Sequence, residues 1–259
     1  PDLIHRYDLA GPRYTSYPTA LQFNDQVSPF DLLHALRESR KAQRPLSLYV
    51  HVPFCANICY YCACNKVITK DRSKADIYLD YLEKELALHA EALGDGVREV
   101  AQLHFGGGTP TFLNDAQLTR LMAAIRQHFH LQTGGEFSIE IDPRKVSADT
   151  VRLLASLGFN RMSVGVQDFE PAVQAAVNRI QSEEETRLVI DTARAAGFKS
   201  VSIDLIYGLP LQTVDSVMRT VERVLAMDPD RLAIYNYAHL PHMFMPQRRI
   251  NEAELPSAE

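Results

Sequence analysis

Hydrophobic and polar residues alternate along several short segments of the chain, which is the pattern of β-strands with one buried face. The segments span residues 46–53, 99–105, 136–142, 161–167, 200–206 and 231–237. In the third segment Phe137 and Ile139 share one face, whereas Ser138 and Glu140 share the other. A sheet covered by helices on both faces would show near-continuous apolar runs instead. We therefore predict strands with one apolar face against helices and one polar face.

Helical patterns separate these strands and carry recognisable start and stop signals. Ser28 precedes a proline, and Ser73, Asn114 and Ser182 are each followed three residues later by an acidic or amide side chain, as in a capping box. Gly158 and Gly197 stand where helices would end. Repeated strand and helix alternation predicts a parallel sheet with right-handed crossovers.

The polar face of the predicted strands indicates which α/β architecture the chain adopts. A closed eight-stranded barrel fills its interior with side chains, whereas a polar interior suits a wider barrel that holds a polar ligand. We predict a partial TIM-like (β/α)6 barrel over residues 46–241, preceded by an N-terminal segment, 1–45, that covers the site. Residues 242–259 leave no room for a sixth covering helix, so we expect a truncated tail before a C-terminal domain.

Composition and charge narrow the classes of partner. The chain has 259 residues, of which 46% are hydrophobic and 23% charged, as in globular proteins. Its net charge of -5 provides no positive field for nucleic acid or an anionic membrane. It has neither a secretory signal pattern nor a run of about 18 uncharged apolar residues. We expect a cytoplasmic monomer that binds neither nucleic acid nor membranes.

All four cysteines lie within ten residues, at positions 55, 59, 62 and 64. Such clustering closes no useful disulfide loop and favours a metal or cluster site. Cys55, Cys59 and Cys62 follow the first strand, and active sites of βα barrels lie at that end of the strands. Three thiolates can hold three irons of a [4Fe–4S] cluster and leave the fourth iron open, whereas electron-transfer clusters use four. Zinc and redox-sensing or inert thiols are the alternatives, although structural zinc sites join two separated ligand pairs.

Other residues on predicted strand ends are candidates for ligand binding. The glycine turn at 106–108 allows close backbone approach, and its N–H groups suit a carboxylate, although such a run is also a common simple turn. Glu140 and Asp204 are single acids on the polar strand face, where each either binds a ligand or forms a structural ion pair.

The cysteine spacing resembles the signature of the radical S-adenosylmethionine (SAM) enzymes. Further stretches resemble the family of oxygen-independent coproporphyrinogen III oxidases, also called coproporphyrinogen dehydrogenases, over essentially the whole chain. They are GPRYTSYPTA (11–20), SLYVHVPFC and CYYCACNK (within 47–66), LHFGGGTPTFL (103–113), SIEIDPR (138–144), RMSVGVQDF (161–169), VNRIQ (177–181), IDLIYGLPLQT (203–213) and NYAHLP (236–241).

This resemblance implies an activity in haem biosynthesis. Two propionates of coproporphyrinogen III would be oxidatively decarboxylated to vinyl groups by a 5′-deoxyadenosyl radical, giving protoporphyrinogen IX, with an electron donor that the sequence does not identify. The family extends well beyond the last matching motif, so we expect this chain to be weakly active. A haem-binding chaperone on the same fold and a radical enzyme with another substrate are the alternatives. The chaperones usually lack the Cys62-x-Cys64 extension and the 11–20 motif, which are both present here.

The resemblance also assigns the site residues. It implies cluster ligation by Cys55, Cys59 and Cys62, with Cys64 important for function without being a ligand. It implies two SAM molecules in one site, in contact with Tyr49, Tyr61, Gly107, Gly108, Thr109, Glu140, Gln167, Arg179, Asp204 and Ala238. Among these, Glu140 would contact the first SAM, whereas Gln167, Arg179 and Asp204 would contact the second.

Overall fold

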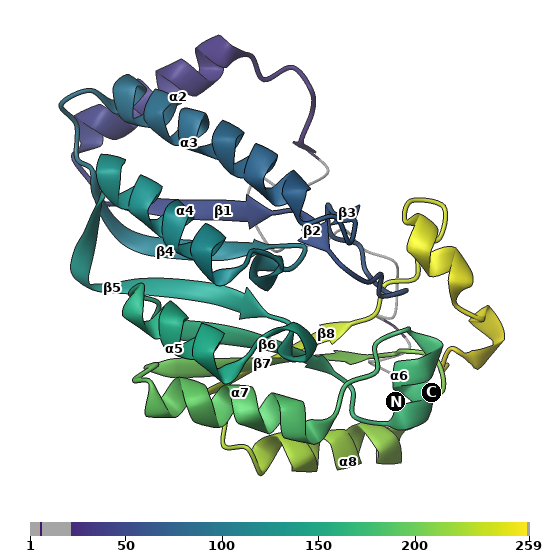
Figure 1. Cartoon of the computed structure of the whole chain (residues 1–259). Helices are drawn as coiled ribbons and strands as arrows, with labels where there is room; N and C mark the ends of the chain where they lie inside the picture. The colour runs from purple at the N-terminus through teal and green to yellow at the C-terminus, as the bar shows by residue number, and fades with distance from the viewer. Residues whose placement is uncertain (1–5, 7–21, 258–259) are drawn as a thin grey trace.

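The computed structural model describes residue 6 and residues 22–257. The first 21 residues of the predicted N-terminal segment, apart from residue 6, therefore lie outside the described part, and the covering role of segment 1–45 stays a prediction. In the described part of this segment, helix α2 (Pro29–Ala42) packs on the outer side of helix α3 (Ser73–Leu93) (Figure 1).

A parallel sheet forms the centre of the molecule, with strand order β1-β4-β5-β6-β7-β8 (Figure 1). The strands are β1 (Leu46–Val52), β4 (Glu99–Gly107), β5 (His130–Ile141), β6 (Arg161–Gln167), β7 (Ser200–Tyr207) and β8 (Arg231–Asn236). Every predicted strand is confirmed. Strands β1 and β8 end the sheet within the described residues, so the α/β fold is a partial, open barrel as predicted.

Helices between the strands cover one face of this sheet (Figure 1). They are α3, α4 (Asp115–His128), α5 (Ala148–Ser156), α7 (Glu183–Ala195) and α8 (Val214–Leu225). The short helix α6 (Pro171–Ala176) lies beyond the carboxyl ends of the strands (Figure 1). Capping boxes are confirmed at Ser28, Asn114 and Ser182, where each side chain accepts from a backbone N–H one turn ahead. The predicted cap at Ser73 is wrong, because α3 begins at Ser73 itself and its hydroxyl donates to Asp71.

The two sheet faces differ in burial as the alternation predicts. Ile139, Val164 and Ile203 have no exposed surface and pack in one hydrophobic core with residues of the covering helices. On the opposite face, Ser163 and Asp204 are only partly buried and line open pockets. Burying an aliphatic side chain contributes about 1.5–3 kcal/mol. Stability therefore comes from one face, and the other is available to ligands.

Strand β5 is longer than predicted because it contains an irregularity. It begins at His130 and changes register against β4 around Gly134, whose φ is +81°. A side chain at Gly135 would place its Cβ 2.8 Å from the Ala101 carbonyl oxygen. The two glycines thus permit a bulge that joins two paired segments into one strand.

Four short elements near the carboxyl edge of the sheet were not predicted from the sequence. Strands β2 (Phe54–Cys55) and β3 (Val67–Ile68) pair with each other on either side of the segment that carries the cysteines, residues 55–66, which we call the cysteine loop. After β8, the 3-10 helices η4 (Met245–Arg249) and η5 (Glu252–Glu254) return toward this loop. The buried side chain of Gln247 in η4 donates to the backbone oxygens of Tyr61, at 3.0 Å, and Ala238, at 3.2 Å. No helix in the described part of the chain is long and apolar enough to cross a membrane.

Because only one face of the sheet is buried, substitutions at neighbouring residues of β7 should have very different effects on the free energy of unfolding. We expect Ile203→Ala to lower the free energy of unfolding by about 2–5 kcal/mol, because it leaves a cavity in a fully buried position. Ser202→Ala, on the polar face, should change it by no more than about 0.5 kcal/mol. Urea denaturation followed by circular dichroism measures both, and equal losses would contradict the one-sided core.

Candidate functional site

The cysteine loop leaves the sheet at the end of β1 and is fixed at its base and at its tip. At the base, Thr69 N donates to the Cys55 carbonyl at 2.9 Å. At the tip, Asn178 Nδ2 donates to the Ile58 carbonyl at 2.7 Å, and Tyr60 N donates to the Val177 carbonyl at 2.9 Å. The tip of the loop is therefore held against the segment that follows β6 by one backbone hydrogen bond and one hydrogen bond from a side chain.

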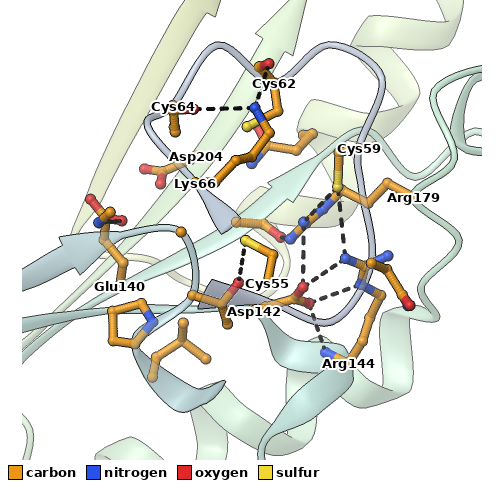
Figure 2. A pocket seen from close by; sticks show the side chains of 18 of the residues that line it. Cys55, Cys59, Cys62, Cys64, Lys66, Glu140, Asp142, Arg144, Arg179 and Asp204 are labelled. Carbon is orange, nitrogen blue, oxygen red and sulfur yellow. Dashed lines mark hydrogen bonds and ion pairs between the residues drawn. The ribbon is translucent and has the colours of Figure 1, made fainter. Parts of the chain in front are cut away.

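A pocket of about 230 Å³ lies between this loop and the carboxyl ends of the strands (Figure 2). It is lined by all four cysteines and by all the other predicted site residues except Tyr49 and Ala238. Those residues are Tyr61, Gly107, Gly108, Thr109, Glu140, Gln167, Arg179 and Asp204. The structure thus gathers residues from six separate parts of the sequence around one space.

The thiols in this pocket have different environments. Hydrogen bonding from Cys64, helped by the charge of Lys66, lowers the pKa of Cys62 to about 6 despite burial. The same interaction with Cys62 raises the pKa of Cys64, which therefore stays a protonated donor. Burial raises the pKa of Cys55, whose sulfur lies 3.4 Å from Thr109 Oγ1. A metal ligand must be a thiolate, and the lowered pKa favours this form of Cys62.

Lys66 shapes the end of the loop. Its Nζ donates to the carbonyl oxygens of Cys62 and Cys64, at 3.1 Å in both cases. The ammonium group therefore holds the C-x-C segment in a tight turn.

The glycine turn after β4 gives a close backbone approach to the cysteine loop. Gly107 has a φ of +116°, which favours glycine, and its N–H donates to Glu140 Oε2 at 3.3 Å. A side chain at Gly108 would place its Cβ 2.7 Å from the Pro53 carbonyl oxygen. Glycine at these positions is therefore required by space and by backbone conformation.

The acids on the polar strand face are in different states of pairing. Glu140 lies beside His104, with 3.4 Å between its Oε1 and the ring Nε2. Asp204 accepts from the Ser163 hydroxyl at 2.8 Å. Burial raises the pKa of Asp204, and the nearby charge of Glu140 adds to the rise. Both carboxylates line the pocket, with an imidazole beside Glu140 and a hydroxyl beside Asp204, and both can bind a cationic ligand group there.

Gln167 reaches the pocket through a left-handed backbone conformation, with a φ of +68°. The register between β6 and β7 shifts just before this residue. A non-glycine residue in this region is strained, and such strain collects at functional sites.

Arg179 is buried at the back of the pocket, with 7% of its surface exposed. Its guanidinium donates to the Gly165 carbonyl, to Gln181 Oε1 at 3.1 Å and to Cys59 Sγ at 3.6 Å. Burial alone would lower its pKa, but the opposing charges around it, including Asp142, keep the pKa above its ordinary value. This residue is fixed in place before any ligand binds.

Tyr49 and Ala238 lie apart from this pocket. Tyr49 is 58% exposed on the polar face of β1, where its hydroxyl lies 2.9 Å from His51 Nδ1. Ala238 follows β8, and its carbonyl accepts from Gln247. Their proposed contacts with SAM stay predictions.

Sequence reasoning missed an ion-pair cluster at the pocket wall. Asp142 and Arg144, directly after β5, form a two-pronged pair and both line the pocket (Figure 2). Burial opposes ionisation of Asp142, but Arg144 and Arg179 hold its pKa below the ordinary value. The SIEIDPR stretch was the available signal, but a short acid and arginine pair after a strand also reads as an exposed turn.

The site suits an iron–sulfur cluster by its donors and its shape. Three thiols line one pocket together with a close backbone turn, and thiolates are the preferred ligands of such clusters. Because the cluster irons are separate atoms, their ligands need not converge on a point.

Comparisons with known proteins point to the same chemistry. The family model of the radical SAM superfamily matches residues 49–224. Oxygen-independent coproporphyrinogen III oxidase from Pseudomonas aeruginosa is 60% identical over 260 residues, which cover 99% of this chain and 56% of the relative. The enzyme of the same name from Escherichia coli is 51% identical over 257 residues, covering 99% and 55%.

Solved structures agree with these matches. Coproporphyrinogen III oxidase from Escherichia coli, described as a radical SAM enzyme, superimposes with a TM-score of 0.91 at 49% identity, covering 99% of this chain and 57% of that one. A radical SAM methyltransferase from Kitasatospora setae shares the fold alone, with a TM-score of 0.53 at 16% identity, covering 80% and 36%. The chain thus spans just over half the length of the oxidases that it matches.

The resemblance first indicated by the cysteine spacing is confirmed. With three loop cysteines at the carboxyl edge of a partial barrel and a superfamily model that matches most of its length, the chain belongs to the radical SAM superfamily, where it is similar to the oxygen-independent coproporphyrinogen III oxidases.

Proposed function

We propose that this chain carries the cluster and SAM site of an oxygen-independent coproporphyrinogen III oxidase. The reaction is the oxidative decarboxylation of two propionates of coproporphyrinogen III to vinyl groups, giving protoporphyrinogen IX in haem biosynthesis. The observation that carries the proposal is the gathering of Cys55, Cys59 and Cys62 with the glycine turn and the strand-end acids in one pocket. The 60% identity to an enzyme of this name supports the substrate.

In this proposal Cys55, Cys59 and Cys62 hold a [4Fe–4S] cluster. When bound, the cluster supplies one electron that splits SAM and yields the 5′-deoxyadenosyl radical. Cys64 keeps its proton and donates to the Cys62 sulfur, which fits a supporting role without ligation. The walls of the pocket position the reacting groups and exclude water from them.

The pocket offers complementary groups to the amino acid part of SAM. Its ammonium group suits the Glu140 carboxylate, and its carboxylate suits the backbone around Gly107, Gly108 and Thr109. Tyr61, half-buried against the apolar cluster of Val173, Val177 and Leu209, provides an apolar surface for the adenine.

A second SAM molecule is part of the proposal. Gln167, Arg179 and Asp204 line the wall formed by β6 and β7 and the segment after β6. Asp204 is the free acid on this side, so it is the group best suited to a second ammonium.

We also propose a cytoplasmic monomer that takes electrons from a separate donor. All four cysteines are free thiols, and cytoplasmic conditions keep thiols reduced for cluster assembly.

The activity predicts two products from one incubation. After anaerobic reconstitution with iron and sulfide, and with SAM, a one-electron reductant and an electron acceptor supplied, the chain should convert coproporphyrinogen III to vinyl products and CO2 and release 5′-deoxyadenosine. Chromatography measures both organic products, with the Pseudomonas aeruginosa relative as positive control. We expect slower turnover than the relative. If the relative is active and the chain gives neither product but binds haem tightly at one to one, the haem chaperone is favoured.

The ligand assignment predicts that the cysteines are not equivalent. Cys59→Ser should lose most of the bound iron and sulfide and the visible absorbance of the cluster, because one of three protein ligands is gone. Cys64→Ser should retain them, since it removes a donor and not a ligand. Chemical iron and sulfide assays on anaerobic protein measure both. Full iron in the Cys59 variant would refute its assignment.

The two-molecule proposal predicts a stoichiometry. Equilibrium dialysis of the cluster-loaded chain against labelled SAM should give two molecules per chain. Asp204→Asn should reduce this to one, because the second ammonium loses its charge partner, whereas Ser202→Ala on the same strand should leave two. Binding of a single molecule by the unaltered chain would contradict the second site.

A further inference from the structure

Arg144 lies against a cysteine that is distant in sequence. It belongs to the 3-10 helix η3 (Pro143–Lys145) just beyond β5, and its side chain is only 10% exposed. Its Nη2 lies 3.8 Å from Cys59 Sγ, within the reach of a hydrogen bond to sulfur (Figure 2). None of the roles proposed above uses this residue.

Asp142 fixes the orientation of this guanidinium. Arg144 Nε donates to Asp142 Oδ1 at 2.9 Å, and Nη2 donates to Oδ2 at 2.6 Å. The backbone N–H of Arg144 also donates to Asp142 Oδ1, at 3.2 Å. A two-pronged pair of this kind sets direction as well as distance, and a lysine cannot reproduce it.

A second arginine reaches the same sulfur from another segment. Arg179 Nη1 lies 3.6 Å from Cys59 Sγ and 3.6 Å from Asp142 Oδ2. Two guanidiniums and one carboxylate leave one net positive charge beside the sulfur. All three side chains are at most 11% exposed, so solvent screens this charge weakly.

The net positive charge beside Cys59 affects how readily a cluster held by this cysteine accepts an electron. Reduction adds a negative charge, and N–H donors to the sulfurs together with nearby positive charge make it more favourable. We propose that Arg144, oriented by Asp142, is a positioning residue that donates to the Cys59 sulfur and raises the reduction potential of the cluster. This inference rests on the cluster assigned under the proposed function.

The test measures a potential instead of turnover. The 259-residue chain and its variants are reconstituted anaerobically, assayed for iron and sulfide, and titrated with dithionite without SAM while electron paramagnetic resonance follows the reduced cluster. Arg144→Gln should shift the potential to a more negative value at unchanged iron content. Arg144→Lys keeps the positive charge but cannot form the two-pronged pair with Asp142, so its reduction potential should shift less, in the same direction. Arg152→Gln, which removes an exposed arginine paired with Asp149 on α5, should leave the potential unchanged.

The outcomes separate this inference from the proposed function. A normal potential in Arg144→Gln with full iron overturns the role of Arg144 and leaves the cluster assignment intact. If Arg144→Gln loses its iron, the reduction potential of Arg144→Lys is the deciding measurement. An unchanged cluster potential in Arg144→Lys overturns the proposed role of Arg144. Failure of the unaltered chain to bind iron overturns the cluster assignment and this inference with it.

Discussion

The structure depends on burial of a parallel sheet from one side only. Along strands β4 to β7, alternate residues such as Ile139 and Ile203 are fully buried under helices, and this face supplies the hydrophobic free energy of folding. The residues between them lie on the opposite face, where they do not pack in the hydrophobic core. Strand β8 differs, because its apolar residues Leu232 and Ile234 are exposed. Because all the strands run in the same direction, their carboxyl ends meet at one edge. Alternation places polar residues at these strand ends, and the parallel direction of the strands is enough to bring them together at one edge of the sheet.

Charge is handled differently in the two halves of the pocket. On the side of β5, Asp142 is shared between two buried arginines, which keep it ionised and are themselves kept in place. On the side of β7, Asp204 accepts a hydrogen bond from the Ser163 hydroxyl, and burial together with the charge of Glu140 raises its pKa. The carboxylate of Asp142 is thus stabilised by charge pairs inside the protein. The ionised form of Asp204 would be favoured by a cationic ligand group.

Local patterns predicted the fold well because they act over a few residues. The strand positions follow from alternation, and the caps at Ser28, Asn114 and Ser182 follow from hydrogen bonds within one turn. Ser73 shows the limit, since the acid at Asp71 takes its hydroxyl and only the surrounding loop decides the competition. The bulge in β5 was missed for a similar reason, because two glycines allow a bulge without requiring one.

The site was predictable where a motif placed several residues together. The cysteine spacing and the family resemblance located most of the pocket, but the contact of Arg144 with Cys59 spans 85 positions in the sequence. No local period encodes such a contact. The sequence placed Asp142 only at the end of the predicted strand 136–142, because its partners come from the next turn and from the segment after β6.

The anchoring of the cysteine loop has a consequence for how the protein is assembled. Asn178 and Val177 hold the tip of the loop, and β2 and β3 close its base, through bonds that involve no sulfur. In zinc fingers the metal itself drives folding, so its removal unfolds the domain. The contacts that hold this loop do not use the cysteine sulfurs, so oxidative loss of a cluster would leave each of them in place, and a new cluster could be assembled on a loop that already has its conformation.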